Sequence, residues 1–271
     1  MTSSSPYDPP ERPERPGLRR MRRRRRRAVL LLAMLVAATG GAVGITRLSE
    51  PSRPVRVPLA AEPTLMPDAD TAPPSAGPTG YPTAGPGTFA VAGGRSPVRG
   101  HAGPLRRYRV EVERGAGPDV DAFAATVDRV LGDPRSWIAS GLLRVQRVPE
   151  AAAADFTVYL ATPVTSERMC AEGGLHTERY TSCRLPGRVV LNLARWMTAV
   201  PDYGAPLDTY RTYVINHEVG HEFGELHQAC PHPGAPAPVM QQQTYGLDGC
   251  VPNAWPYVGG VRYSGEPTDG V

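Results

Sequence analysis

This chain of 271 residues contains the stretch His217-Glu218-Val219-Gly220-His221-Glu222-Phe223-Gly224-Glu225-Leu226-His227. His217 and His221 are four residues apart, so on one helix their side chains lie on the same face and can reach one metal ion. Gly224 can take a left-handed conformation, which ends a helix and returns the chain toward the metal, so we expect His227 to be the third ligand. Three neutral imidazoles with an open fourth position are typical of a catalytic Zn²⁺ site.

The residues between the histidines have separate expected roles. Glu218 is too close in sequence to His217 to be a natural ligand, but it is well placed to polarise a water molecule beside the metal. Val219 and Phe223 are expected to pack on the core, and Gly220 to allow the close approach of a neighbouring element. Both remaining acidic residues, at positions 222 and 225, are expected to be solvated and to take no part in the chemistry.

The pattern His217-Glu218-x-x-His221-x-x-Gly224-x-x-His227 resembles the zinc signature of the metzincin metallopeptidases, in which a methionine-containing turn follows and lies beneath the metal. Pro238-Val239-Met240 matches that turn. The resemblance implies an α+β fold, a metzincin-like zincin domain in which a twisted mixed sheet lies above the cleft beside an active-site helix.

One position departs from the metzincin pattern. Several metzincin families carry a tyrosine two residues after the turn methionine, where this chain has Gln242, and the nearest tyrosine is Tyr245. Tyr245 is therefore a candidate auxiliary ligand or oxyanion donor, and its alternative is an ordinary half-buried tyrosine. The alternative for Met240 is plain core packing.

A second resemblance is closer and covers more of the chain. The stretch from about residue 210 to 255 resembles a family of uncharacterised membrane-anchored or secreted proteins of high-GC Gram-positive bacteria, and the likeness extends over roughly residues 105–256. It brings no established substrate.

These residues predict metal-assisted hydrolysis. Zinc would lower the pKa of its bound water and stabilise the oxyanion, and Glu218 would accept a proton and pass it to the leaving amine. We expect a zinc metallopeptidase that acts on a protein or peptide, with cell-wall peptide among the substrates considered. The alternative is a non-catalytic zinc-binding or interaction module displayed at the cell surface, which keeps the metal for stability.

The N-terminal sequence predicts a location outside the cytoplasm. Residues 1–27 contain ten arginines and three acidic residues, a charge of +7, whereas the whole chain carries +4. The remainder is thus slightly acidic, which gives no indication of nucleic-acid binding. Residues 28–46 are uncharged and long enough to span a bilayer, and the preceding arginines predict a cytoplasmic N-terminus. We expect a single-pass signal-anchor in the cell membrane, with secretion after signal cleavage as the alternative.

Two further segments follow the anchor. Residues 47–104 contain 12 Pro and 8 Gly and are expected to form a disordered linker. Residues 105–271 have the composition of one globular extracytoplasmic domain. Its hydrophobic pattern predicts helices over residues 119–131 and 210–223, and strands over residues 105–113, 142–148, 156–161 and 189–193.

Four cysteines lie in the globular domain, and an oxidising compartment favours disulfides. Three pairings are open, of which we favour Cys170 with Cys183 and Cys230 with Cys250, because each closes a local loop rich in Gly or Pro. The alternative is a structural zinc site, which the absence of a Cys-x-x-Cys spacing disfavours. Substrate specificity is expected in the loops of residues 170–183 and 241–246.

Overall fold

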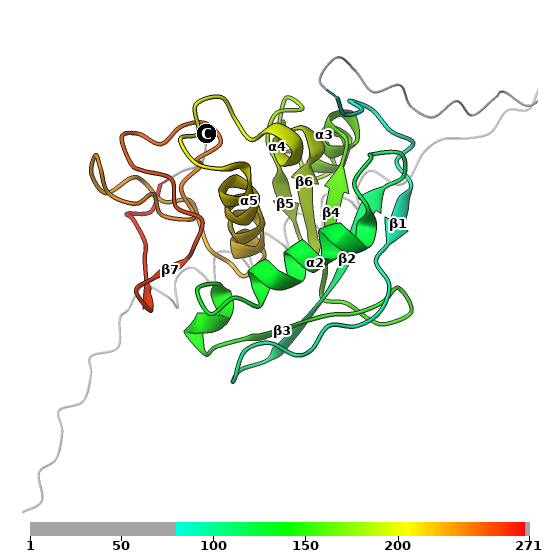
Figure 1. Cartoon of the computed structure of the whole chain (residues 1–271), viewed down its shortest axis with the longest axis horizontal. Coiled ribbons are helices and arrows are strands. Elements are labelled where there is room, and N and C mark those ends of the chain that lie inside the picture. Colours follow the sequence, from blue (N-terminus) through cyan, green and yellow to red (C-terminus); the bar gives the residue numbers. More distant parts are fainter. Residues whose placement is uncertain (1–79, 269–271) are drawn as a thin grey trace, which may run out of the picture. The chain divides into compact units, whose positions relative to one another are not determined.

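A computed structural model describes residues 80–268 of the chain. The main strands are β1 (Phe89–Val91), β2 (Leu105–Glu113), β3 (Arg144–Arg147), β4 (Phe156–Ala161), β5 (Cys183–Leu185) and β6 (Arg188–Asn192). They form one twisted mixed sheet in the order β1-β2-β4-β6-β5, with β3 paired to β2 (Figure 1). Strands β2, β4 and β6 are parallel, whereas β1 and β5 at the edges run antiparallel to their neighbours.

Helices cover both faces of this sheet. They are α2 (Val120–Leu131), the 3-10 helix η1 (Trp137–Ser140), α3 (Pro163–Ala171), α4 (Leu193–Thr198) and α5 (Leu207–Glu222). A short hairpin of β7 (Tyr257–Val258) and β8 (Val261–Arg262) follows near the C-terminus. Figure 1 shows α2 and α5 together on one side of the sheet.

Successive side chains of a strand point to opposite faces of the sheet, and each face packs in its own hydrophobic core. In β4, Val158 and Leu160 are fully buried in the larger core, which α2 and α5 complete. Tyr159 and Ala161 point to the opposite face and pack in a smaller cluster with Met169 of α3. This period of two is expected for a sheet that is covered on both sides.

The hydrophobic pattern predicted these central elements well. The expected helix at residues 119–131 is α2, and the side chain of Asp119 caps it by accepting a hydrogen bond from the Ala122 N–H at 2.8 Å. The expected strands correspond to β2, β3, β4 and β6, and the expected active-site helix to α5, each within three residues at either end. A mixed α+β domain with a twisted sheet is confirmed.

The predicted boundary of the linker at residue 104 is wrong. Residues 80–104 belong to the folded domain, because β1 pairs with the end of β2 and Ala92 is buried in the core. The buried carboxylate of Glu113 also accepts a hydrogen bond from the Gly87 N–H at 2.8 Å. A strand of three residues is too short to show a hydrophobic period. Because β1 also lies within Pro- and Gly-rich sequence, the composition of that segment predicted a linker.

The basic tail, the signal-anchor at residues 28–46 and the first part of the linker lie outside the described residues. Among residues 80–268, no helix has the length and apolar character needed to cross a bilayer. Both favoured disulfides are confirmed, since Cys170 is bonded to Cys183 and Cys230 to Cys250.

Candidate metal centre

Helix α5 carries the first two histidines and ends in a Schellman motif. The Gly224 N–H donates to the His221 carbonyl at 3.1 Å, and the Glu225 N–H donates to the Gly220 carbonyl at 3.0 Å. Gly224 has φ 95°, a left-handed conformation that only glycine adopts without strain. The predicted helix end is therefore confirmed, and it turns the chain so that His227 returns to the helix.

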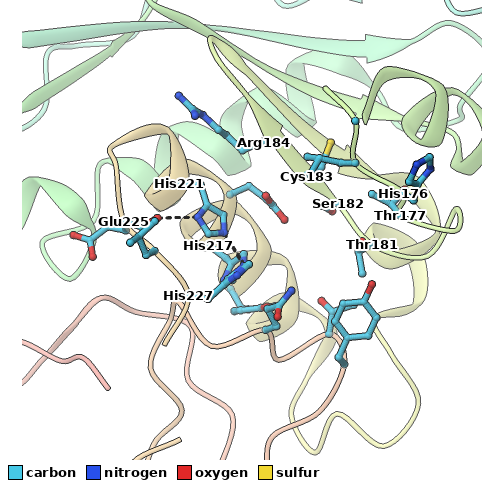
Figure 2. Close-up of a pocket in the computed structure, with 18 of the residues that line it drawn as sticks. His176, Thr177, Thr181, Ser182, Cys183, Arg184, His217, His221, Glu225 and His227 are labelled. Atoms are coloured by element: carbon cyan, nitrogen blue, oxygen red, sulfur yellow. Dashed lines mark hydrogen bonds between the residues drawn. The ribbon is translucent and has the colours of Figure 1, made fainter. Parts of the chain in front are cut away.

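Three imidazoles meet at this turn. The Nε2 atom of His221 lies 3.3 Å from Nε2 of His217 and 3.0 Å from Nε2 of His227. The nitrogen atoms of the group all lie within 4.8 Å of one another, so the three side chains could hold a metal ion. Figure 2 shows them converging at one end of a pocket.

Backbone carbonyls orient the two helical imidazoles. Nδ1 of His217 lies 2.9 Å from the Val239 carbonyl, and Nδ1 of His221 lies 2.8 Å from the Glu225 carbonyl. A carbonyl oxygen can only accept, so each Nδ1 carries the proton and each Nε2 keeps its lone pair for a metal. The Gly224 turn thus supplies both the third histidine and the carbonyl that orients the second.

The third imidazole is positioned through its main chain. The Thr268 N–H donates to the His227 carbonyl at 3.0 Å, and the next N–H, of Gln228, donates to the Met240 carbonyl at 3.1 Å. The Ala229 N–H donates to the Glu266 carbonyl at 2.9 Å. His227 therefore lies in a segment held between the turn at Met240 on one side and the C-terminal residues on the other.

Burial sets the protonation of these groups. Burial lowers the pKa of His217 well below its usual value, and the neighbouring His221 lowers it further. Burial also lowers the pKa of His221. Burial of His227, together with the electrostatic cost of protonating it beside His221, brings its pKa to about 4. The imidazoles are thus neutral near pH 7, the form that binds metals.

Glu218 lies beside the histidines in the wall of the same pocket, and only 6% of its surface is exposed. Burial raises the pKa of its carboxyl group to about 8. A nearby cation would favour the ionised carboxylate.

Met240 lies against the helix just before His221. A Cβ atom at Gly220 would lie 2.5 Å from the Met240 sulfur and 2.6 Å from Cζ2 of Trp137, so only glycine permits this contact. The close approach expected at Gly220 is confirmed. Val219 is fully buried and Phe223 packs against the same core, as expected.

A pocket of about 520 Å³ opens beside the three histidines. Its walls come from the two loops in which we expected specificity, since residues 174–184 and the stretch containing Gln242, Thr244 and Tyr245 both line it. Tyr245 is about half exposed, and its ring centroid lies 6.1 Å from that of Tyr180. The structure thus brings Tyr245 into the pocket but places it at the rim.

The prediction that Glu222 is a solvated residue is wrong. Its side chain is buried and accepts a hydrogen bond from Arg184 Nε at 2.7 Å, and its second oxygen lies 3.5 Å from Arg106. These partners come from β5 and β2 and are distant in sequence, so no local pattern could reveal them. Glu225 is partly exposed and pairs with Arg262 at 2.8 Å, so it is not simply solvated either.

The fold and the site together define an α+β protein with a three-histidine centre that could hold a metal ion. The chain belongs to the family described as protein of unknown function (DUF3152), whose model matches residues 75–251. No curated protein and no solved structure matches the chain. The family match starts within the predicted linker, in agreement with the folded residues before position 105.

Proposed function

We propose that this protein is a metzincin-like, zinc-dependent peptide hydrolase. The observation that carries the proposal is the convergence of three Nε2 atoms beside the buried carboxyl of Glu218 in the wall of one pocket. A site that only stabilised the fold would need neither the pocket nor a buried acid next to the ligands. The two disulfides and the three-histidine centre are compatible with an extracytoplasmic domain.

Zinc fits the two nitrogen separations that involve His221, and the three ligand atoms all lie within 4.8 Å of one another. Bonds of about 2.0–2.1 Å in a tetrahedral arrangement separate neighbouring ligand atoms by roughly 3.3 Å. His221 Nε2 lies at 3.3 Å and 3.0 Å from the other two ring nitrogens, close to that separation. Three neutral nitrogen ligands also suit zinc better than calcium or magnesium, which prefer oxygen.

Glu218 would do the proton chemistry of the reaction. When bound, zinc supplies a water of lowered pKa and polarises the substrate carbonyl. Glu218 takes a proton from the attacking water and gives it to the leaving amine, so that water adds across the peptide bond. Its burial favours the proton-carrying form of the carboxyl group between these two steps, which suits this transfer.

The proposed location follows from the N-terminal sequence. The arginine-rich residues 1–27 and the apolar residues 28–46 support a membrane anchor with the hydrolase outside the cell. The substrate would then be a protein or peptide accessible from outside the membrane, and wall peptide is one such substrate.

The test compares the full chain with its Glu218→Gln variant. A fragment that begins at residue 105 is unsuitable because it lacks β1. We expect the full chain to bind one zinc ion and to cleave members of a peptide library. Glu218→Gln should keep the zinc and lose activity by roughly 10²–10⁴-fold, the usual contribution of a general base.

Two results would contradict the proposal. If both proteins hold zinc and neither cleaves any library member, the site belongs to a non-catalytic zinc-binding module. If His227→Ala leaves zinc content and affinity unchanged, His227 is not the third ligand.

A further inference from the structure

The pocket beside the histidines has walls from three separate segments, and their chemistry limits what it can accept. This inference rests on the proposed function, because it names the class of substrate that the hydrolase would take. Residues 174–184 form one wall, residues 224–227 adjoin the metal ligands, and residues around Tyr245 close the remaining side. Figure 2 shows His176 and Thr181 on the side of the pocket away from the three metal-binding histidines.

Two charged side chains of the wall, Arg184 and Glu225, are held in ion pairs with other residues of the protein. Arg184 is paired at 2.7 Å with Glu222, which Arg106 also contacts at 3.5 Å, and Glu225 is paired with Arg262 at 2.8 Å. Glu222 and Arg262 do not line the pocket, so each of these two wall charges already has a partner behind the wall. The other ionisable wall side chains are the three ligands, Glu218, two tyrosines and the exposed His176.

This compensation disfavours charged substrates. A lysine or glutamate side chain entering the pocket would give up its hydration without gaining a dedicated partner of opposite charge. A glutamate could pair with Arg184 only by displacing Glu222, and a lysine could pair with Glu225 only by displacing Arg262. In each case the displaced residue would lose its partner. An uncharged side chain meets neither cost.

Three exposed apolar side chains line the pocket. Residues 80–268 have eight large hydrophobic side chains that are exposed, and three of them line this pocket: Leu175 at 42%, Tyr245 at 53% and Leu226 at 72% exposure. They come from three different walls. Single exposed hydrophobic residues are ordinary, but several around one opening are typical of a binding site.

Leu226 is next to the metal-binding centre. It directly precedes His227, whose main chain is fixed by hydrogen bonds on both sides. Because Leu226 and His227 line the same pocket, a substrate whose carbonyl group approached the centre would have neighbouring side chains within reach of this leucine. Contact with it would remove apolar surface from water for both partners, which favours binding.

We propose that the site selects uncharged peptide segments whose residues beside the cleaved bond are apolar, with Leu175, Leu226 and Tyr245 as the contact surface. The occupant is a substrate polypeptide. The ion pairs of Arg184 and Glu225 disfavour charged segments, and the three apolar side chains bind the uncharged ones.

Binding of peptide hydroxamates tests this without requiring catalysis. Three short acetylated peptides end in a hydroxamate group that binds the metal, and differ only in whether the adjacent side chain is Leu, Glu or Lys. Each is titrated against the full zinc-loaded chain. We expect the Leu peptide to bind at least about 10-fold more tightly than the charged peptides, the ratio that burial of one aliphatic side chain provides.

Two leucine variants test whether Leu226 is responsible for the tighter binding of the Leu peptide. Leu226→Ala should weaken binding of the Leu peptide by about 10-fold and leave the Glu and Lys peptides unchanged. Leu142, which is 75% exposed and does not line the pocket, provides the control, and Leu142→Ala should change nothing.

Several outcomes would overturn the inference: equal or tighter binding of a charged peptide, no effect of Leu226→Ala, or no binding of any peptide by the zinc-loaded chain. Self-association that Leu226→Glu abolishes would show that the rim holds a second copy of the chain and would also overturn it. The proposed hydrolase activity fails separately, through loss of cleavage, so the two failures are distinguishable.

Discussion

Replacing Gly220 by alanine is the sharpest test of how the centre is built. In an ordinary helix the change would stabilise the protein by about 1 kcal/mol, because alanine is the better helix former. Here the new Cβ would lie 2.5 Å from the Met240 sulfur and 2.6 Å from Cζ2 of Trp137. Both neighbours are buried, so neither can turn into solvent.

The magnitude follows from these opposed effects. Forcing an extra carbon into a packed core costs about 1–3 kcal/mol, and two contacts below 3.0 Å place Gly220 at the upper end of that range. After subtracting the helix gain, we expect a loss of about 2 kcal/mol in the free energy of unfolding. For a domain of this size the melting temperature would fall by roughly 4–8 °C.

Metal affinity should fall as well. A shift of Met240 also moves the adjacent Val239 carbonyl, which orients His217 through Nδ1 at 2.9 Å. Disturbing such an orienting group typically weakens metal binding by about 10- to 100-fold. Thermal unfolding without metal and zinc titration of the folded chain measure the two effects separately.

A double-mutant cycle with Met240→Ala identifies the contact responsible. Removing the sulfur should relieve part of the strain, so the two changes should be coupled by at least about 1 kcal/mol. A Gly220→Ala variant that melts above the parent, or changes that are simply additive, would refute the close approach of Met240 to the helix.

Two further changes test the support around the centre. Replacing both Cys230 and Cys250 by alanine should lower the free energy of unfolding by about 3 kcal/mol, the value expected for a loop closed over a sequence separation of 20 residues, and urea denaturation measures it. An unchanged value would show that the disulfide does not brace the loop. Gly265→Ala would place a Cβ atom 2.1 Å from the Ala229 carbonyl and should weaken zinc binding by about 10-fold. Gly93→Ala, where the new atom meets nothing within 4 Å, is its control, and equal zinc affinities in the two variants would contradict the role of the C-terminal segment.

The sequence predicted the parts of the site that depend on local geometry. The spacing of His217 and His221 and the conformational freedom of Gly224 are properties of a single helix and its end. The favoured disulfides also close short loops, at separations of 13 and 20 residues. In each case neighbouring residues determine the outcome, so a pattern read along the chain is sufficient.

The remaining features depend on contacts between distant residues. The partner of Glu222 in β5 is 38 residues away, and β1 is a strand only because β2 offers it a free edge. A glutamate on a helix looks the same in sequence whether it is solvated or buried in an ion pair with a distant arginine. Hydrophobic periodicity therefore located the central strands and missed the short edge strands β1 and β5, of which β5 contributes to the pocket.

The three histidines are recognisable in the sequence, but the groups that position them are not. His217, His221 and His227 are each held by main-chain groups, respectively the Val239 carbonyl, the Glu225 carbonyl and the Thr268 N–H. Almost any residue can provide a main-chain carbonyl, so residue types at these positions carry no signal of their own. Packing sets the positions of these main-chain groups instead. Met240 packs on Gly220 beside the Val239 carbonyl, and the C-terminal segment packs beside His227. Metal affinity should therefore respond to changes in volume at these contacts more strongly than to changes in the polarity of the exposed side chains around them.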